Sequence, residues 1–334
     1  REFGSLQQSG IMNGQTTENG ADKMFDLTGK KALVYDRKLQ LLQEIKGLSY
    51  CYDAYISPDE KKVLLISTGN AFYILSLEDF VIERYNIRGK YKGNLEGRGC
   101  WSFDGKNVFL CIQEADGGML SALRSYQTEK MSEYEDLLYD KYWLTSITPI
   151  YDQSQYLLIG LNRVDDKNYM IWYNGSTFEP YYIEDFDDVV VHAEYDVCKR
   201  ELILSGLEYT IICDCYGKKL KTIHGRGDTL FSFSDVFKGC GLQQEGFKDI
   251  KALSNAFGFE NALISDSILC ACYVKDGKYI CIGTMTSLCC MEAESSKIVA
   301  QRKIPHGVHD IVEIEKNIIL VSTWQGVKAY NITE

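Results

Sequence analysis

Short apolar runs alternate with charged turns along most of the chain. The stretch CYDAYISPDEKKVLLIST, residues 51–68, places an apolar run on each side of the polar turn Ser57–Lys62. The same order of apolar run, acid-bearing turn and stronger apolar run occurs six times. The turn acids are Asp59, Asp104, Asp152, Asp196, Asp276 and Glu315. Their separations of 45, 48, 44, 80 and 39 residues predict a repeated antiparallel hairpin, with the longest gap close to two periods.

A third and usually a fourth strand follow each hairpin. Residues 71–87, 210–223 and 288–304 each contain two further apolar runs joined by a polar turn. The repeating unit is therefore four antiparallel strands in roughly 40–48 residues, the size of a β-propeller blade. In this respect residues 30–334 resemble the WD40-like and YVTN-like β-propellers, although no Trp-Asp pair ends a unit and no Gly-His pair begins one. The resemblance implies an all-β propeller of four-stranded antiparallel blades.

The two ends of the chain carry incomplete sets of strands. Residues 30–45 read as a third and a fourth strand, and residues 309–332 read as a first, a second and a third. We expect the N- and C-terminal strands to close the ring, with Lys38–Ile45 donated to the last blade, because closure removes a free sheet edge. The spacing favours seven blades, one of them degenerate and within the 80-residue gap. Six blades with a large insertion is the alternative.

Residues 225–263 break the repeat. Apolar positions at helical spacing, followed by a glycine, predict a short amphipathic helix in this stretch. These positions are Phe247, Ile250, Leu253 and Phe257. We expect the insertion, at about 228–263, to bind a partner through these side chains; packing of the same face onto a neighbouring blade is the alternative. A single propeller domain would span 24–334, after a polar lead-in at 1–23 that begins with REFGS, typical of a cloning scar.

The composition supports a β-rich core and an acidic surface. Hydrophobic residues make up 45% of the 334 positions, and 23 Tyr and 14 Phe against 4 Pro favour strands. The formal net charge of −11, with lysines and arginines scattered, argues against nucleic acid or an anionic membrane as a partner. No apolar run approaches the roughly 20 residues of a membrane-spanning helix, and no N-terminal stretch predicts a signal peptide. The expected partner is therefore a protein or a peptide.

The cysteines carry no recognisable metal spacing. Twelve are present, and none forms a Cys-x-x-Cys pair. Cys213 and Cys215 are two apart in an apolar run, as are Cys270 and Cys272, so each pair would lie on one face of a strand. We expect buried, reduced thiols that pack as small hydrophobic side chains, and hence a reducing compartment, the cytoplasm.

Few residues suggest chemistry. Among four histidines, His306 and His309 are the best candidates for metal ligands. A spacing of three along a strand does not place both rings on one face, and the sequence implies no third ligand, so we predict no metal and no cofactor. No G-x-S-x-G, P-loop or H-E-x-x-H motif is present.

These patterns favour a non-catalytic β-propeller over an enzyme. Such a propeller would bind a protein or peptide through one face of the disc and the 228–263 insertion, as the recognition module of a larger regulator does. The alternative is a propeller enzyme of the lactonase, lyase or quinoprotein type, with a site in the central channel where residues from different blades converge.

Overall fold

The structure is a computed structural model. It describes residues 23–28, 30–36, 40–49, 51–67, 69–87, 89, 91–93, 98–114, 121–206, 209–224, 268–304, 307–315, 317–323 and 326–332. Regular structure in these ranges is β-strand, apart from one 3-10 turn at Tyr151–Gln153. The helix predicted around Phe247, Ile250, Leu253 and Phe257 lies outside the described residues, and so does His306. No described segment forms a helix with the length and apolar character needed to cross a membrane.

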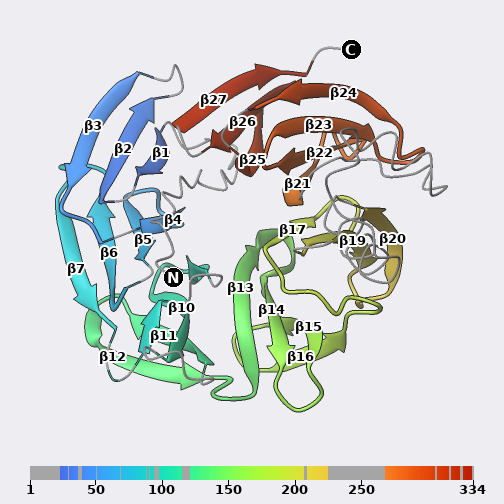
Figure 1. Ribbon diagram of the computed structural model, residues 1–334. Helices are drawn as coiled ribbons and strands as arrows, with labels where there is room; N and C mark the ends of the chain where they lie inside the picture. Colours follow the sequence, from blue (N-terminus) through green and yellow to red (C-terminus); the bar gives the residue numbers. More distant parts are fainter. Residues whose placement is uncertain are drawn as a thin grey trace, which may run out of the picture. The chain divides into compact units, whose positions relative to one another are not determined.

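The chain divides into two compact units, residues 1–184 with 309–334 and residues 185–308. The described residues of the first unit form five sheets, and Figure 1 labels their strands in chain order. The N-terminal sheet contains β1 (Lys23–Thr28), β2 (Lys31–Asp36) and β3 (Leu41–Lys46). The second sheet contains β4 (Cys51–Ile56), β5 (Lys62–Ser67), β6 (Ala71–Ser76) and β7 (Ile82–Asn86).

The third sheet has five strands because β8 and β9 both pair with β10. It contains β8 (Tyr91–Gly93), β9 (Gly99–Trp101), β10 (Asn107–Glu114), β11 (Ser121–Gln127) and β12 (Lys130–Leu137). The fourth sheet contains β13 (Tyr142–Ile150), β14 (Gln155–Asn162), β15 (Lys167–Tyr173) and β16 (Phe178–Tyr182). The C-terminal sheet contains β25 (Val308–Glu315), β26 (Ile318–Thr323) and β27 (Gly326–Asn331).

The second unit contains two four-stranded sheets in its described residues. One contains β17 (His192–Asp196), β18 (Glu201–Ser205), β19 (Tyr209–Asp214) and β20 (Lys219–His224). The other contains β21 (Ile268–Val274), β22 (Tyr279–Thr284), β23 (Ser287–Glu292) and β24 (Ile298–Lys303). In both sheets each strand pairs antiparallel with the next strand of the chain.

The predicted hairpin repeat is confirmed. In six sheets the turn acid follows or ends the first strand of the hairpin, as Asp59 does after β4 and Asp104 after β9. This matches the alternative of six repeated units with a large insertion. Between Asp196 and Asp276, the described residues add no strand beyond those of the two sheets that flank the gap.

The N-terminal strands depart from the prediction. The predicted donation of Lys38–Ile45 to the last blade is wrong, because β3 pairs with β2, with Leu41 opposite Tyr35. β1, in a stretch for which the sequence predicts no strand, pairs with the other edge of β2. The N-terminal strands thus form a seventh sheet of their own within the described residues.

A short turn explains the local pairing of β2 and β3. The backbone N–H of Gln40 donates to Asp36 Oδ1 at 2.8 Å, and the N–H of Asp36 donates to the Gln40 carbonyl at 3.0 Å. Closing this turn orders only a few residues. Donation of β3 to the C-terminal sheet would instead have to close almost the whole chain, and loop-closure entropy rises with the length closed.

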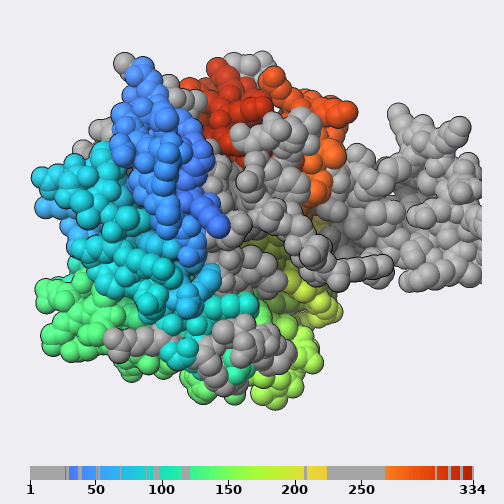
Figure 2. Space-filling model, turned by 60° about the vertical axis from the view of Figure 1, so that its left-hand side comes forward, coloured from blue at the N-terminus to red at the C-terminus, as the bar shows by residue number. Residues whose placement is uncertain are grey.

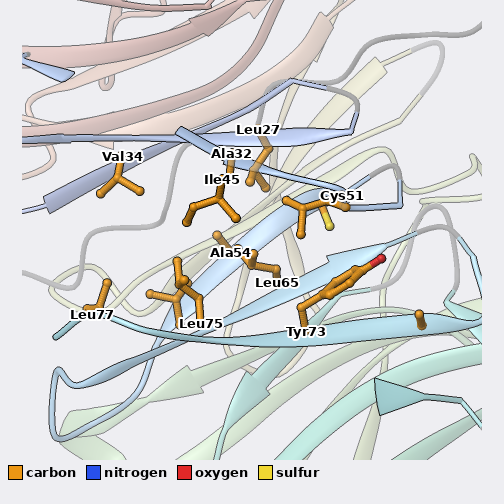
Figure 3. Packing of buried hydrophobic residues seen from close by; sticks show 13 residues of the cluster. Leu27, Ala32, Val34, Ile45, Cys51, Ala54, Leu65, Tyr73, Leu75 and Leu77 are labelled. Carbon is orange, nitrogen blue, oxygen red and sulfur yellow. The ribbon is translucent and has the colours of Figure 1, made fainter. Parts of the chain in front are cut away.

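Neighbouring sheets of the first unit pack face to face. Leu27, Val34 and Ile45 of the N-terminal sheet belong to one buried cluster with Leu65 and Leu75 of the second sheet, and Figure 3 shows these side chains converging between the two layers. In Figure 2 the blue residues of the N-terminal sheet lie directly against the cyan residues of the second sheet. Burial of each such aliphatic side chain stabilises the fold by roughly 1.5–3 kcal/mol.

Burial depends on the position of a strand in its sheet. In the second sheet, β5 and β6 are buried over five of their six residues, whereas β7 contains only half-buried and exposed residues. The third and fourth strands of the other complete sheets differ in the same sense, as β23 and β24 show. The side chains open to a partner therefore belong mainly to turns and fourth strands.

Candidate functional site

The turn between β4 and β5 is a closed network of hydrogen bonds. Ser57 Oγ donates to Asp59 Oδ1 at 2.6 Å, and the backbone N–H of Lys62 donates to Ser57 Oγ at 2.9 Å. The N–H of Lys61 donates to the same Asp59 oxygen at 3.2 Å. Short polar side chains that bond to nearby backbone groups favour turns over continued strands. This explains why the chain reverses at Ser57–Lys62.

The turn between β9 and β10 repeats this network. Ser102 Oγ donates to Asp104 Oδ1 at 2.7 Å, and the N–H of Asn107 donates to Ser102 Oγ at 2.8 Å. Gly105 adopts a φ of +69°, a left-handed conformation that costs glycine little. The second and third sheets thus present the same Ser-x-Asp turn.

A groove of about 320 Å³ lies between these two turns. Both turns contribute to its walls, together with aromatic residues of the third sheet and the turn that precedes β12. Its lining residues are Ser57, Pro58, Asp59, Lys62, Trp101, Phe103, Asp104, Gly105 and Thr128. The groove therefore combines two carboxylates and one ammonium group with two aromatic side chains.

The aromatic walls of the groove are fixed by contacts beneath them. Trp101 Nε1 donates to the Tyr55 carbonyl at 2.9 Å, which ties the third sheet to the second. Phe103 stacks on Tyr156, with ring centroids 4.4 Å apart, and meets the edge of Tyr151 at 5.2 Å. These contacts already order the two aromatic side chains. Binding of a ligand against them therefore costs little further conformational entropy.

The two carboxylates of the groove are ionised at neutral pH. Partial burial raises the pKa of Asp59, but the hydrogen bonds from Ser57 and from the Lys61 N–H outweigh it, and the pKa lies below its usual range. The hydrogen bond from Ser102 lowers the pKa of Asp104, and the N–H of Lys106 lowers it further. Each turn holds Oδ1 of its aspartate, so the groove carries two fixed negative charges.

A second polar cluster surrounds Asp53 in the same unit. Asp53 of β4 is 7% exposed; Arg98 Nε lies 3.4 Å from its Oδ2, and the Tyr55 hydroxyl donates to that oxygen at 2.6 Å. Burial raises the pKa of Asp53, Arg98 and Tyr55 oppose this, and the charge of Asp310 on β25 adds to it. Because Arg98 and Tyr55 satisfy its carboxylate, this cluster has the form of an internal ion pair that joins neighbouring sheets.

Of the residues predicted from sequence as site residues, only His309 lies in the described part of the chain. His309 lies on β25, where burial lowers its pKa to about 4 although Asp310 raises it. The other histidine of the predicted pair and the four apolar residues of the insertion lie outside the described residues. Within the described part of the chain, no three His, Cys, Asp or Glu side chains come together in a way that could hold a metal ion.

The sequence reveals only part of the groove. It identifies the turns that contain Asp59 and Asp104 as two copies of one hairpin. It does not reveal that Trp101, Phe103 and Thr128 line the space between them, because that depends on how two sheets pack. The Ser-x-Asp spacing shared by two successive turns is the signal that could have directed attention here.

Comparison with known proteins identifies the fold. No protein-family model matches this sequence, and no curated protein sequence matches it. Among solved structures, the chain is similar to the β-propeller domain of Cps50 (Swd1) from Myceliophteria thermophila, with a TM-score of 0.65 and 11% sequence identity over 100% of this chain and 99% of that one. At this identity the similarity concerns the fold. The chain has the all-β fold of a β-propeller.

Proposed function

We propose that the chain is a non-catalytic β-propeller, a single domain over 24–334, that binds a protein or peptide partner through one face of the disc and the insertion at 228–263. The observation that carries this proposal is the groove between the Ser57–Lys62 turn and the turn that contains Asp104. It joins fixed charges to fixed aromatic surfaces, a combination that suits a peptide side chain with both polar and apolar parts.

The charges of the groove favour a basic partner segment. The carboxylates of Asp59 and Asp104 can each form a charge-assisted hydrogen bond with an arginine or lysine. Trp101 and Phe103 supply apolar surface against which the aliphatic part of such a side chain can pack. The net charge of −11 would also draw basic partners over longer distances.

The test uses a double variant that removes charge and keeps the turns. Asp59→Asn with Asp104→Asn leaves an oxygen at each Oδ1 position, so the hydrogen bonds from Ser57 and Ser102 can persist. The probes are fluorescent nine-residue peptides that carry arginine, lysine, leucine or glutamate at one position of a neutral sequence. We expect the arginine and lysine peptides to bind best in fluorescence anisotropy, and the double variant to weaken them by about tenfold or more, since hydrogen bonds to charged groups contribute about 1.5–3 kcal/mol.

A third turn acid provides the matched control. Asp152 is exposed and lies in the turn between β13 and β14, outside the groove. Asp152→Asn should leave peptide affinity unchanged. Equal loss in this control, or equal binding of the arginine and glutamate peptides, would contradict binding at the groove.

The insertion at 228–263 remains the second predicted contact. Its apolar residues Phe247, Ile250, Leu253 and Phe257 would supply an apolar contact for the partner. Deletion of residues 234–260 should preserve the circular dichroism of the β-sheets and reduce recovery of the partner. Full recovery of the partner with the deleted chain would remove the insertion from the binding surface.

The compartment proposed from sequence is the cytoplasm. Its support is the set of cysteines: each one that the structure describes is a free thiol, and all of these except Cys198 are buried. Such thiols persist in a reducing environment.

The cluster around Asp53 favours the alternative of an enzyme. A buried carboxylate with a raised pKa beside an arginine and a tyrosine is a common arrangement in catalytic sites. The test measures hydrolysis of a panel of lactones by the unsubstituted chain and by Asp53→Asn. Hydrolysis that is lost in Asp53→Asn, with the free energy of unfolding unchanged, would support the hypothesis of an enzyme. Full retention of such an activity in Asp53→Asn would exclude this carboxylate as its site.

A further inference from the structure

Three cysteines form a row across three adjacent strands of the second unit. Cys272 of β21 lies opposite Cys281 of β22, and Cys281 lies opposite Cys290 of β23. Figure 1 shows these strands side by side in one sheet. Residues directly opposite each other in an antiparallel sheet project from the same face. The three thiols therefore share one face of the sheet.

The backbone of the sheet already provides the geometry of a disulfide. Opposite residues in an antiparallel pair have Cα atoms about 4.5 or 5.5 Å apart, depending on the type of pair. Disulfides span Cα separations of about 4.4–6.8 Å. All three cysteines are reduced and buried, with Cys272 5%, Cys281 1% and Cys290 8% exposed. A bond between neighbours in this row would need little movement of the backbone.

The thiol of Cys290 differs from other buried thiols of the chain. A hydrogen bond from the Cys281 thiol lowers the pKa of Cys290, burial opposes this, and the charge of Lys275 lowers the pKa further. In contrast, burial raises the pKa of Cys51 and of Cys213 to about 12. A thiolate is the reactive form of cysteine. The pKa of Cys290 is therefore lowered where those of Cys51 and Cys213 are raised, and Cys281 lies directly opposite Cys290.

We propose that Cys281 and Cys290 are a redox-active pair that a peroxide converts into a cross-strand disulfide. The Cys290 thiolate attacks one peroxide oxygen, so that an S–O bond forms, the O–O bond breaks and hydroxide leaves. The Cys281 sulfur then attacks the sulfenic sulfur of Cys290, which forms the S–S bond and expels the oxygen as hydroxide. That hydroxide takes the proton of Cys281 and becomes water. Two thiols lose two electrons, the peroxide is reduced to water, and a thiol reductant reverses the change.

The sulfur of Cys272 is the competing partner for Cys281. It lies on the other side of Cys281 at the same register, so the backbone would permit either bond. The hydrogen bond between Cys281 and Cys290 and the nearby Lys275 select the second pair. The assignment is therefore specific to one of two geometrically similar bonds.

The test locates the bond in the full chain treated with hydrogen peroxide and then alkylated. Trypsin with cyanogen bromide cleaves after Lys278, Met285 and Met291, which separates the fragment with Cys281 from the fragment with Cys290. We expect the two fragments to stay joined until reduction, with a loss of two alkylatable thiols. Fragmentation of the joined species should place the bond at Cys290 and not at the adjacent Cys289, which lies opposite Ile282.

Variants separate the two chemical steps. Cys281→Ser should stop the reaction at a sulfenic acid on Cys290 that dimedone traps, and Cys290→Ser should abolish the joined species. Cys272→Ser is the matched control and should leave the bond intact. The exposed Cys198 reports that peroxide is active in the same sample. Two results with the unsubstituted chain would overturn the proposal. In the first, peroxide modifies Cys198 while Cys281 and Cys290 stay reduced. In the second, Cys281 forms its bond with Cys272.

Discussion

The second sheet and the C-terminal sheet begin alike and end differently. Their first strands carry Asp53 and Asp310, and each of these aspartates accepts a hydrogen bond at Oδ1 from the next backbone N–H, at 3.2 and 2.9 Å. In the second sheet β7 covers the edge of the third strand, β6, which is buried over five residues. Among the described residues no strand covers β27, the third strand of the C-terminal sheet, and three of its six residues are exposed.

The difference shows that a strand's composition reflects its neighbours. β6 has the sequence AFYILS, which suits burial on both faces, whereas β27 has GVKAYN, with a lysine and an asparagine exposed. The exposed pattern of β27 resembles that of a fourth strand such as β7. A lysine on an uncovered edge also discourages pairing with other chains.

The largest expected effect concerns tyrosines at third strands. Tyr73 of β6 is 3% exposed, and the Ser49 N–H donates to its hydroxyl at 2.6 Å, whereas Tyr330 of β27 is half-buried. We expect Tyr73→Ala to reduce the free energy of unfolding by about 3–5 kcal/mol and Tyr330→Ala by about 1 kcal/mol or less. Urea unfolding followed by circular dichroism measures both. Similar losses would show that β27 is covered in solution.

A slightly smaller effect concerns cations at third strands. Arg124 of β11 is 2% exposed and donates to both oxygens of Asp136 on β12, at 2.5 and 2.8 Å. Lys328 of β27 is exposed. Asp136→Ala should cost about 2–3 kcal/mol, below the value for a fully buried pair because Asp136 is 24% exposed.

The matched change at the uncovered strand is Lys328→Ala. It should alter the free energy of unfolding by about 0.5 kcal/mol at most. Urea unfolding at low and high salt checks both changes. A loss above about 1 kcal/mol for Lys328→Ala would imply that a fourth strand supplies this lysine with a partner.

The pattern of hairpins could be predicted from sequence, because strand, turn and strand are close in the chain. The turns at Asp59 and Asp104 are such local features. The strand β1 could not be predicted, since KMFDLT becomes a strand through its pairing with β2. The groove also depends on contacts between sheets, as Trp101 shows by its hydrogen bond to Tyr55.

His309 of the C-terminal sheet should make the free energy of unfolding depend on pH. Burial lowers the pKa of His309 to about 4, from an ordinary 6.5 in the unfolded chain. The unfolded state therefore binds the proton first, so stability is present above pH 6.5 and falls as the pH decreases toward 4. We expect a loss of about 1.5 kcal/mol between pH 6.5 and 5.

A neutral substitution isolates this effect. His309→Gln should flatten the stability profile between pH 6.5 and 5, with other titrations unchanged. Unfolding in urea at several pH values measures the slope. An equal slope in the variant would mean that His309 is already protonated in the folded chain or exposed to solvent.

Hydrogen exchange followed by NMR compares the edges of β6 and β27 most directly. Backbone amides of β6 are paired on both sides, whereas those of β27 are paired within the described residues on the side of β26 only. We predict that alternate amides of β27 exchange at least about 100-fold faster than the amides of β6, because no strand must open to expose them. Uniformly slow exchange along β27 would contradict an uncovered third strand and show that another segment completes the C-terminal sheet.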